Sequence, residues 1–268
     1  MRQFAASSAT ASPLPWPAGD ARPVSGRWLA VDLPRVEEQL ALDEALLEEA
    51  HAGRLTAPVV RTWMAAEPTV VVGSSSRIDE EVDREAARRA AARIVRRPSG
   101  GLTVVLGPGC VMWSVVAPLP AEWSPPIARL HAALLDPLAG ALVAAGRPVV
   151  RRGSSDLALR DDGGERKVSG NALRVRRGAV LYHGTLLDDF DLGLVSLLLR
   201  HPPREPEYRG GRDHAAFLAN LSLGRATIDA AVRRAFAADE PQADWPAGRV
   251  AALARNRYES VAWTERTA

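Results

Sequence analysis

Glu165-Arg166-Lys167-Val168-Ser169-Gly170-Asn171-Ala172 is the stretch from which the fold and the chemistry of this chain can be worked out. Lys167 is the only lysine in a sequence whose lysine and arginine residues together number 34. Lysine is a compact charge on a flexible stem, whereas arginine is a rigid planar fork that never deprotonates. One lysine can fall anywhere by chance in an arginine-biased chain, so its neighbourhood has to decide between chance and function.

The segments around Lys167 predict three consecutive antiparallel strands. The strands are expected at residues 156–159, 166–175 and 179–187. Two aspartates and two glycines at residues 161–164 are typical of the tight turn between the first two strands. Because such strands bring side chains of one face together, we expect Asp156, Lys167 and His183 to converge on one site.

The rest of the chain mixes helices and strands in no alternating order. Apolar spacing of three to four residues predicts helices at 34–52, 79–92, 127–145, 192–199, 213–221, 227–238 and 250–261. Further β-rich runs are residues 28–32, 59–63, 69–72, 93–97, 102–106 and 110–116. This order predicts an α+β fold, with a mostly antiparallel sheet flanked by helices, over residues 27–268. Residues 1–26 are rich in Ser, Ala, Pro and Gly and are predicted to be a flexible tail.

The composition is that of a soluble globular protein, with 268 residues, 47% hydrophobic and 25% charged. A net charge of +2 without a basic tract gives little reason to expect a nucleic-acid partner. The apolar runs are shorter than the roughly 20 residues of a membrane helix, so no membrane partner is expected. A single cysteine, Cys110, fits a reducing compartment, and we expect a cytoplasmic protein, although residues 1–26 are also compatible with a transit peptide.

A glycine-rich turn, Arg96-Arg97-Pro98-Ser99-Gly100-Gly101, stands between two β-rich runs. Glycines let backbone amides approach a ligand closely, and arginine can receive phosphate or carboxylate. One interpretation is therefore an anion cradle with Arg96 and Arg97 at its entrance. The alternative is a plain β-hairpin with surface arginines.

Taken together, four motifs resemble the lipoate–protein ligases, within the superfamily of biotin and lipoate ligase catalytic domains. Residues 96–101 are similar to the motif Arg-Arg-x-Ser-Gly-Gly of that family. Ser155-Asp156-Leu157 with residues 166–172 is similar to Asn-Asp-Leu followed by Arg-Lys-x-Ser-Gly-Ser-Ala. Residues 183–187 match His-Gly-Thr-Leu-Leu, and residues 42–47 with 61–63 are also similar. The resemblance covers roughly residues 27–224.

The resemblance implies an enzyme that attaches a lipoyl or octanoyl group to a lysine of a lipoyl carrier domain through an acyl-adenylate. Its substrates would be ATP with Mg²⁺, and lipoate or octanoate. Its acceptors would be lipoyl domains of 2-oxoacid dehydrogenase E2 subunits or the glycine cleavage H protein. Two alternatives remain: an ATP-independent octanoyl or lipoyl transferase between carrier domains, and an inert relative that only binds acyl groups or lipoyl domains.

The same resemblance implies roles for individual residues. Lys167 would be catalytic, contacting the acyl carbonyl and the α-phosphate together, while Asp156 would orient Lys167 or bind the metal–nucleotide. Arg97 would hold the nucleotide phosphates, and strands around Trp113 and Val115 would shelter the acyl chain. The backbone along the nucleotide would be that of Leu102, Thr103, Val104 and Val105. The other implied binding residues are Ser99, Gly100, Gly101, Ser169, Gly170, His183, Gly184 and Thr185, with no resident metal.

Several positions also have plainer interpretations or depart from the family pattern. Asp156 could merely close a turn, and His183 is better interpreted as a hydrogen-bonded histidine of the sheet. Acyltransferase relatives carry the acyl group on a cysteine where this chain has Gly153-Ser154-Ser155, and Cys110 is interpreted as a small buried hydrophobe. Leu102 replaces a glycine of the turn. The accessory domain of longer ligases is not expected, so a partner subunit could be needed.

Overall fold

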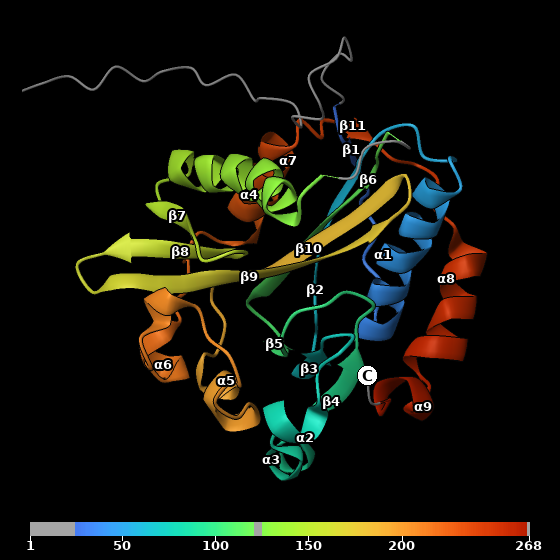
Figure 1. Ribbon diagram of the computed structural model, residues 1–268. Helices are drawn as coiled ribbons and strands as arrows, with labels where there is room; N and C mark the ends of the chain where they lie inside the picture. The colour runs from blue at the N-terminus through green and yellow to red at the C-terminus, as the bar shows by residue number, and fades with distance from the viewer. Residues whose placement is uncertain (1–24, 121–124, 267–268) are drawn as a thin grey trace, which may run out of the picture.

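The computed structural model describes residues 25–120 and 125–266 and has two sheets flanked by helices (Figure 1). The larger sheet has eight strands in the order β11-β1-β2-β6-β10-β9-β8-β7, and the smaller has the order β4-β3-β5. The strands of the larger sheet are β1 (Arg27–Trp28), β2 (Val59–Met64), β6 (Cys110–Pro118), β7 (Val149–Arg152), β8 (Asp156–Asp161), β9 (Gly164–Arg176), β10 (Ala179–Leu187) and β11 (Glu240–Pro241). Those of the smaller sheet are β3 (Thr69–Val72), β4 (Arg93–Arg96) and β5 (Val104–Leu106).

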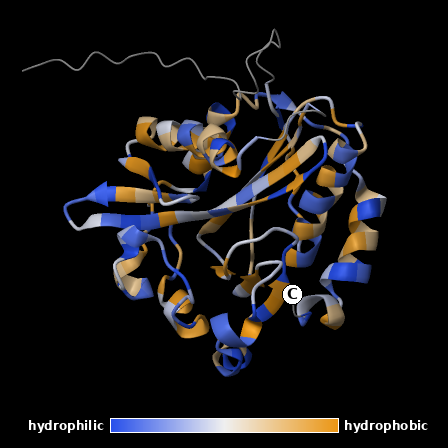
Figure 2. Ribbon diagram, in the orientation of Figure 1, coloured by the Kyte–Doolittle hydropathy of each residue, from blue (hydrophilic) through white to orange (hydrophobic). Residues whose placement is uncertain are grey.

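Helices cover both faces of the larger sheet, so its central strands are apolar on both sides. They are α1 (Val36–His51), α2 (Ile78–Glu81), α3 (Arg84–Arg89), α4 (Ile127–Ala144), α5 (Gly193–Leu198), α6 (His214–Phe217), α7 (Arg225–Ala235), α8 (Ala247–Leu253) and α9 (Val261–Thr264). Short turns η1 (Glu207–Arg209) and η2 (Ala254–Tyr258) complete the set. One core packs α4 and α7 against Trp113 and Tyr182, and the other packs α1 and the smaller sheet against the opposite face. Figure 2 shows hydrophobic residues, in orange, along the central strands and on α4.

The three predicted strands around Lys167 are confirmed as β8, β9 and β10, which pair antiparallel. Their register sets Asp156 opposite Gly170 and His183 opposite Ala172. Between β8 and β9 the register shifts, because Leu157 pairs with Ser169 whereas Ala158 pairs with Lys167. Val168 is thus the extra residue of a β-bulge, a feature that commonly re-aims side chains beside active sites.

A buried network of side-chain hydrogen bonds joins α1 to these three strands. Asp43 on α1 accepts hydrogen bonds from Arg61 Nη1 at 2.8 Å and Ser114 Oγ at 2.9 Å, and its Oδ2 lies 3.2 Å from His183 Nδ1. Desolvation opposes ionisation of Asp43, but the charge of Arg61 and the bond to His183 outweigh it and lower the Asp43 pKa. His183 Nε2 lies 2.6 Å from Ser99 Oγ, so the chain extends into the glycine-rich turn.

The expectation of a hairpin around the glycine-rich turn is wrong. β3 lies between β4 and β5, pairing parallel with the first and antiparallel with the second. Arg96 is buried rather than at an entrance, since its Nε donates to the carbonyl of Thr264 and its Nη1 to those of Gly73 and Ser76, at 2.7 to 2.8 Å. Arg96 thus satisfies three carbonyls of two distant segments, residues 73–76 and α9, and holds the start of the glycine-rich turn against both.

Three predicted helices are shorter than their apolar spacing indicated. The one expected at 213–221 is reduced to α6, because Leu218 is extended and bridges to Lys167 on β9. The helix expected at residues 79–92 is interrupted by Val82 and Asp83, because the Asp83 carboxylate caps α3 by accepting from Ala86 N at 2.8 Å. The helix expected at 250–261 continues from α8 into the π-turn η2 and ends before Ser260 caps α9. α8 and η2 pack on α1, whereas α9 contacts β4 and η2.

By length and composition α4 alone, among the described residues, could cross a membrane. About 44% of it is buried inside the protein, where it packs against α7 and β7 as a core helix does. The expectation that every apolar run is too short for a membrane helix is thus wrong, although this helix belongs to the core. Of the predicted tail, residues 1–24 lie outside the described residues, while Gly26 donates to the carbonyl of Phe236 at 3.1 Å and so belongs to the fold.

Replacing Arg96 with methionine is expected to lower the free energy of unfolding by about 3 kcal/mol, because the buried carbonyls of Gly73, Ser76 and Thr264 lose their donor. Urea unfolding followed by circular dichroism measures it. The control is Arg88→Met at an exposed position of α3, expected to change stability by less than about 0.5 kcal/mol. Equal losses of stability in the two variants would contradict this role of Arg96.

Candidate active site

Lys167 takes part in a three-residue polar group on β8, β9 and η1. Its Nζ lies 2.8 Å from Asp156 Oδ1, and Tyr208 Oη donates to Asp156 Oδ2 at 3.0 Å. Asp156 is nearly buried, so the pair is shielded from solvent on the aspartate side. Of the two roles considered for Asp156, orienting Lys167 is therefore the one that its contacts fit.

Gly170 provides the space in which the Lys167 side chain lies. A Cβ built on Gly170 would stand 2.9 Å from both Cε and Nζ of Lys167. The Gly170 amide itself donates to Thr185 Oγ1 on β10 at 3.2 Å. The glycine is thus needed at this position because the ammonium crosses directly over it.

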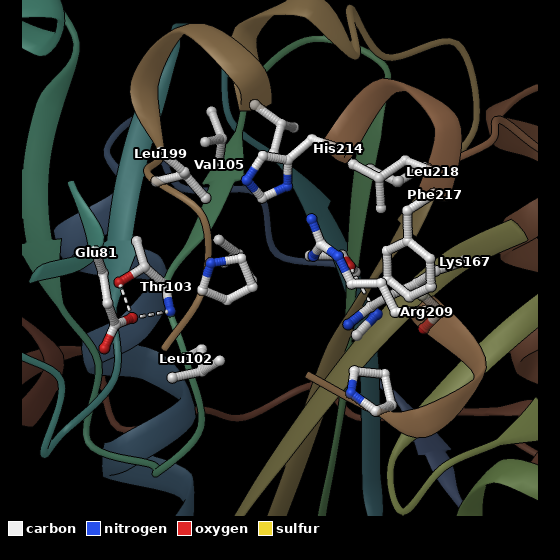
Figure 3. Close-up of a pocket in the computed structure, with 18 of the residues that line it drawn as sticks. Glu81, Leu102, Thr103, Val105, Lys167, Leu199, Arg209, His214, Phe217 and Leu218 are labelled. Carbon is white, nitrogen blue, oxygen red and sulfur yellow. Dashed lines mark hydrogen bonds between the residues drawn. The ribbon is translucent and has the colours of Figure 1, made fainter. Parts of the chain in front are cut away.

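Lys167 opens into a cavity of about 140 Å³ between the two sheets and the segment that follows α5 (Figure 3). Lys167, Arg209 and Phe217 stand on one side of it, with Glu81, Leu102 and Thr103 opposite (Figure 3). The apolar part of the lining consists of Leu102, Val104, Val105, Leu187, Val195, Leu199, Phe217 and Leu218. A cavity of this size accommodates a small apolar group, of the order of a benzene ring.

About half of the predicted site residues line this cavity. They are Lys167, Leu102, Thr103, Val104, Val105, Ser169, Gly170 and Thr185. The others support the lining from behind or beside it and are Arg97, Ser99, Gly100, Gly101, Asp156, His183 and Gly184. The predicted convergence of Asp156, Lys167 and His183 holds for the first two, which lie 2.8 Å apart. His183 is bound instead to Asp43 and Ser99 and does not line the cavity.

Arg97 does not face the cavity, which contradicts the expectation that it holds phosphates. Its guanidinium donates to the carbonyls of Val71, Gly100 and Leu102 at 2.6 to 3.1 Å and to Ser99 Oγ at 3.1 Å. Burial lowers its pKa to about 10, so the group still carries its charge at neutral pH. Arg97 therefore folds the turn around itself, and Gly101, with φ of 86°, closes that turn.

His183 and Gly184 are packed within the sheet. Both ring nitrogens of His183 have partners, Asp43 and Ser99, as expected for a hydrogen-bonded histidine of the sheet. A Cβ on Gly184 would stand 1.7 Å from Asn171 Oδ1, so only glycine fits beside β9. The two residues hold β10 against β9 and the turn, which sets the position of the cavity floor.

The predicted acyl shelter around Trp113 and Val115 is wrong. These side chains belong to the core on the other face of the sheet, with α4 and α7. Residues of β6 and β10 alternate between faces, and the cavity is on the face of His183 and Thr185. Cys110 begins β6 within the α1 core, and burial raises its pKa to about 12. Its thiol therefore stays protonated and enclosed.

Sequence reasoning missed the cavity wall formed by residues 199–218. Its polar members are Arg200, Arg204, Arg209 and His214. Prolines and glycines interrupt this segment, so no periodic pattern marks it. The one available signal was Tyr208-Arg209-Gly210-Gly211-Arg212, a second pair of arginines around two glycines.

The opposite wall carries the carboxylate of Glu81, the last residue of α2. Glu81 accepts hydrogen bonds from Thr103 N and Thr103 Oγ1, both at 2.7 Å, and from Ser76 Oγ at 3.1 Å. All three bonds end on Oε2, and Oε1 accepts none from the described residues. Among the described residues, no group of three or more His, Cys, Asp or Glu side chains is placed to hold a metal ion.

A model of the lipoyl protein ligase A/B catalytic domain matches residues 35–238. The chain belongs to this family. Two octanoyltransferases named LipM are relatives: that of Symbiobacterium thermophilum is 31% identical over 75% of this chain and 80% of its own length. That of Geobacillus kaustophilus is 28% identical over 84% of this chain and 92% of its own length.

Solved structures of the family share the fold at low identity. A bi-partite lipoate protein ligase from Thermoplasma acidophilum, studied with its E2 lipoyl domain, has a TM-score of 0.75 and 22% identity, covering 90% of this chain and 96% of that one. A lipoate-protein ligase A bound with ATP has a TM-score of 0.75 and 22% identity, with 90% and 98% coverage. The predicted family and its α+β fold are thereby confirmed.

Gly170→Ala is expected to slow acyl transfer at least about tenfold, because the new Cβ displaces the Lys167 ammonium from its place. The thermal midpoint should change little, since the atoms that must move are the end of a flexible side chain. Mass spectrometry of an acylated carrier domain measures the rate. The control is Gly248→Ala on α8, where a Cβ meets nothing within 4 Å, and a loss of rate there too would contradict this interpretation.

Proposed function

We propose that this protein is an ATP-dependent ligase that attaches a lipoyl or octanoyl group to a lysine of a lipoyl carrier domain through an acyl-adenylate. The observation that carries the proposal is the Lys167 ammonium, paired with Asp156 and opening into an apolar cavity. The apolar lining is suited to part of an acyl chain, with the polar end of that chain at the cation. Family relatives include a ligase bound with ATP and LipM octanoyltransferases.

Each of the two steps places negative charge on oxygens near Lys167. In the first, a carboxylate oxygen of the acyl donor forms a bond to the α-phosphorus of ATP, and pyrophosphate leaves. In the second, the acceptor amine forms a bond to the acyl carbon, the carbon–oxygen bond to AMP breaks, and the amine loses a proton. A movable ammonium can follow the charge from phosphate to carbonyl, which a fixed guanidinium does less well.

The inventory of nucleophiles favours this route over a transferase with a thioester intermediate. Cys110 is the only cysteine of the sequence, and it is enclosed in the core on α1. The stretch beside the lysine strand contains Gly153-Ser154-Ser155 instead of a cysteine. Activation by adenylation needs no nucleophile from the protein, so it is the chemistry for which this chain has the groups.

Mg²⁺ would arrive with the nucleotide rather than occupy a site of the protein. Asp156 is bound by Lys167 and Tyr208, and Glu81 by Thr103 and Ser76. Magnesium usually keeps several waters and binds substrate phosphates with only one or two carboxylates. Lipoyl domains of E2 subunits or of the glycine cleavage H protein would be the acceptors, as for the Thermoplasma acidophilum ligase with its E2 lipoyl domain.

Incubation with ATP, Mg²⁺ and octanoate or lipoate is expected to release pyrophosphate and to add the acyl group to a lipoyl domain, seen by mass spectrometry. Lys167→Ala is expected to slow the transfer by about 10²- to 10³-fold, because a charge aimed at the developing negative oxygens is lost. Octanoyl transfer between carrier domains without pyrophosphate would show the transferase reaction instead. Ligand binding without either product would indicate an inert relative.

Cys110→Ala is expected to leave the transfer rate within about twofold, because a buried thiol with a pKa of about 12 takes no part in the reaction. Single-turnover measurement with a pre-acylated donor separates a change in the rate of the transfer step from a change in binding. The variant also tests the thioester route directly, which could not survive loss of its only possible thiol. A rate lowered a hundredfold, with an unchanged thermal midpoint, would reinstate that route.

A further inference from the structure

Arg209 has a buried nitrogen that the protein leaves without a hydrogen-bond partner. The residue is only 4% exposed, yet its Nη2 has no partner in the described part of the chain. Such an atom costs free energy unless something satisfies it. Among residues 25–120 and 125–266, six buried side-chain atoms lack a partner, and Arg209 is the only one of their residues that lines the active-site cavity.

The guanidinium of Arg209 is held in a fixed orientation. Its Nε donates to the carbonyl of Arg212 at 2.8 Å and lies 3.3 Å from Glu205 Oε2. Its plane rests on the ring of Phe217, with 4.8 Å between the guanidinium carbon and the ring centroid. These contacts use the Nε edge and one face, so the forked end of the group remains for a ligand.

Arg209 is also connected to the catalytic lysine through its neighbours. The preceding residue, Tyr208, donates to the same Asp156 carboxylate that pairs with Lys167. On the other side, Leu218 bridges to Lys167, next to the Phe217 that supports Arg209. Figure 3 shows Lys167, Arg209 and Phe217 together on one side of the cavity. A ligand at the ammonium is therefore within the same enclosure as the guanidinium.

The charge of this wall is suited to anions. Arg200 and Arg204 are exposed at the cavity rim, whereas Arg209 is buried in its wall. The acidic group of the opposite wall, Glu81, accepts hydrogen bonds from Thr103 and Ser76 through its Oε2 alone. Arg97 is committed to carbonyls of the glycine-rich turn. This wall thus supplies one buried, oriented fork, and the carboxylate of Glu81 stands on the opposite wall of the cavity.

We propose that the Arg209 guanidinium binds an oxyanion of the substrate in the cavity, either a nucleotide phosphate or the carboxylate of the acyl donor, beside Lys167. This rests on the proposed function for the identity of the substrate but not for the existence of the anion site. Both oxyanions match the spacing of the arginine fork and accept two parallel hydrogen bonds. The segment after α5 would then supply the phosphate or carboxylate contact that Arg97 does not.

Isothermal titration of the full chain with ATP, AMP and octanoate tests this, using Arg209→Gln, Arg209→Lys and wild type. The glutamine variant is expected to weaken binding of the ligand that bears the contacted oxyanion by about 10- to 100-fold. Loss confined to ATP and AMP identifies phosphate, and loss confined to octanoate identifies carboxylate. The lysine variant should lie between wild type and glutamine, because it keeps the charge but not the fork.

Glu205→Gln is expected to change the affinity for the anion in the opposite direction to Arg209→Gln, in a protein that is expected to fold. Glu205 competes for Arg209, and glutamine keeps the acceptor for Gly211 N at 2.9 Å while removing the charge. Anion binding should tighten by about twofold to fivefold. The charge-matched control is Arg234→Gln, at an exposed position of α7 on the other face of the sheet, with unchanged affinity expected.

The two proposals can fail separately. Pyrophosphate release with unchanged ATP, AMP and octanoate affinities in folded Arg209→Gln and Glu205→Gln would overturn the anion site and leave the ligase intact. Octanoate affinity that depends on Arg209, in a protein that releases no pyrophosphate, would support the site and overturn the ligase. If Arg209→Gln unfolds, the Glu205→Gln and Arg209→Lys titrations decide alone, and a Glu205→Gln affinity equal to wild type overturns the proposal.

Discussion

The buried carboxylate of Asp43 is the constraint on which the rest of the structure depends. A charge removed from water is tolerated only where partners compensate for its lost hydration. Asp43 has Arg61 on β2, Ser114 on β6 and His183 on β10, so one side chain of α1 fixes three neighbouring strands. The same hydrogen-bond network extends from His183 through Ser99 to the glycine-rich turn. The cavity therefore has a floor and a wall that cannot shift independently.

The sequence was sufficient to predict the central meander but not the smaller sheet. Alternation and a two-glycine turn specify local pairing, which is why β8, β9 and β10 were found with Asp156 and Lys167 close together. The runs around the glycine-rich turn look like a hairpin because they are adjacent in sequence. β3 is inserted between them by a parallel pairing with β4, and nothing local encodes a non-local pairing of that kind.

The residues of the candidate site also divide into those that the sequence predicts and those that only the folded structure reveals. Lys167 and Gly170 were identifiable because a motif and a register place them, whereas the role of Arg97 depends on which carbonyls surround it. An arginine beside glycines can bind a ligand or the loop itself, and only the folded backbone decides. Arg209 was missed because it lies in an irregular segment whose position is set by Tyr208 reaching Asp156 across the fold.

The distribution of cations explains why one lysine persists in a chain otherwise supplied with arginine. Arg61, Arg96 and Arg97 are committed to fixed acceptors within the protein, for which a rigid fork with several donors is suited. Arg209, held at its Nε edge, can serve only an oxyanion that stays in one place. In the proposed ligase reaction, the charge beside the substrate must follow electrons from a phosphate to a carbonyl, which needs a compact group on a flexible stem. Lys167 lies across Gly170, where the lack of a side chain leaves room for that movement.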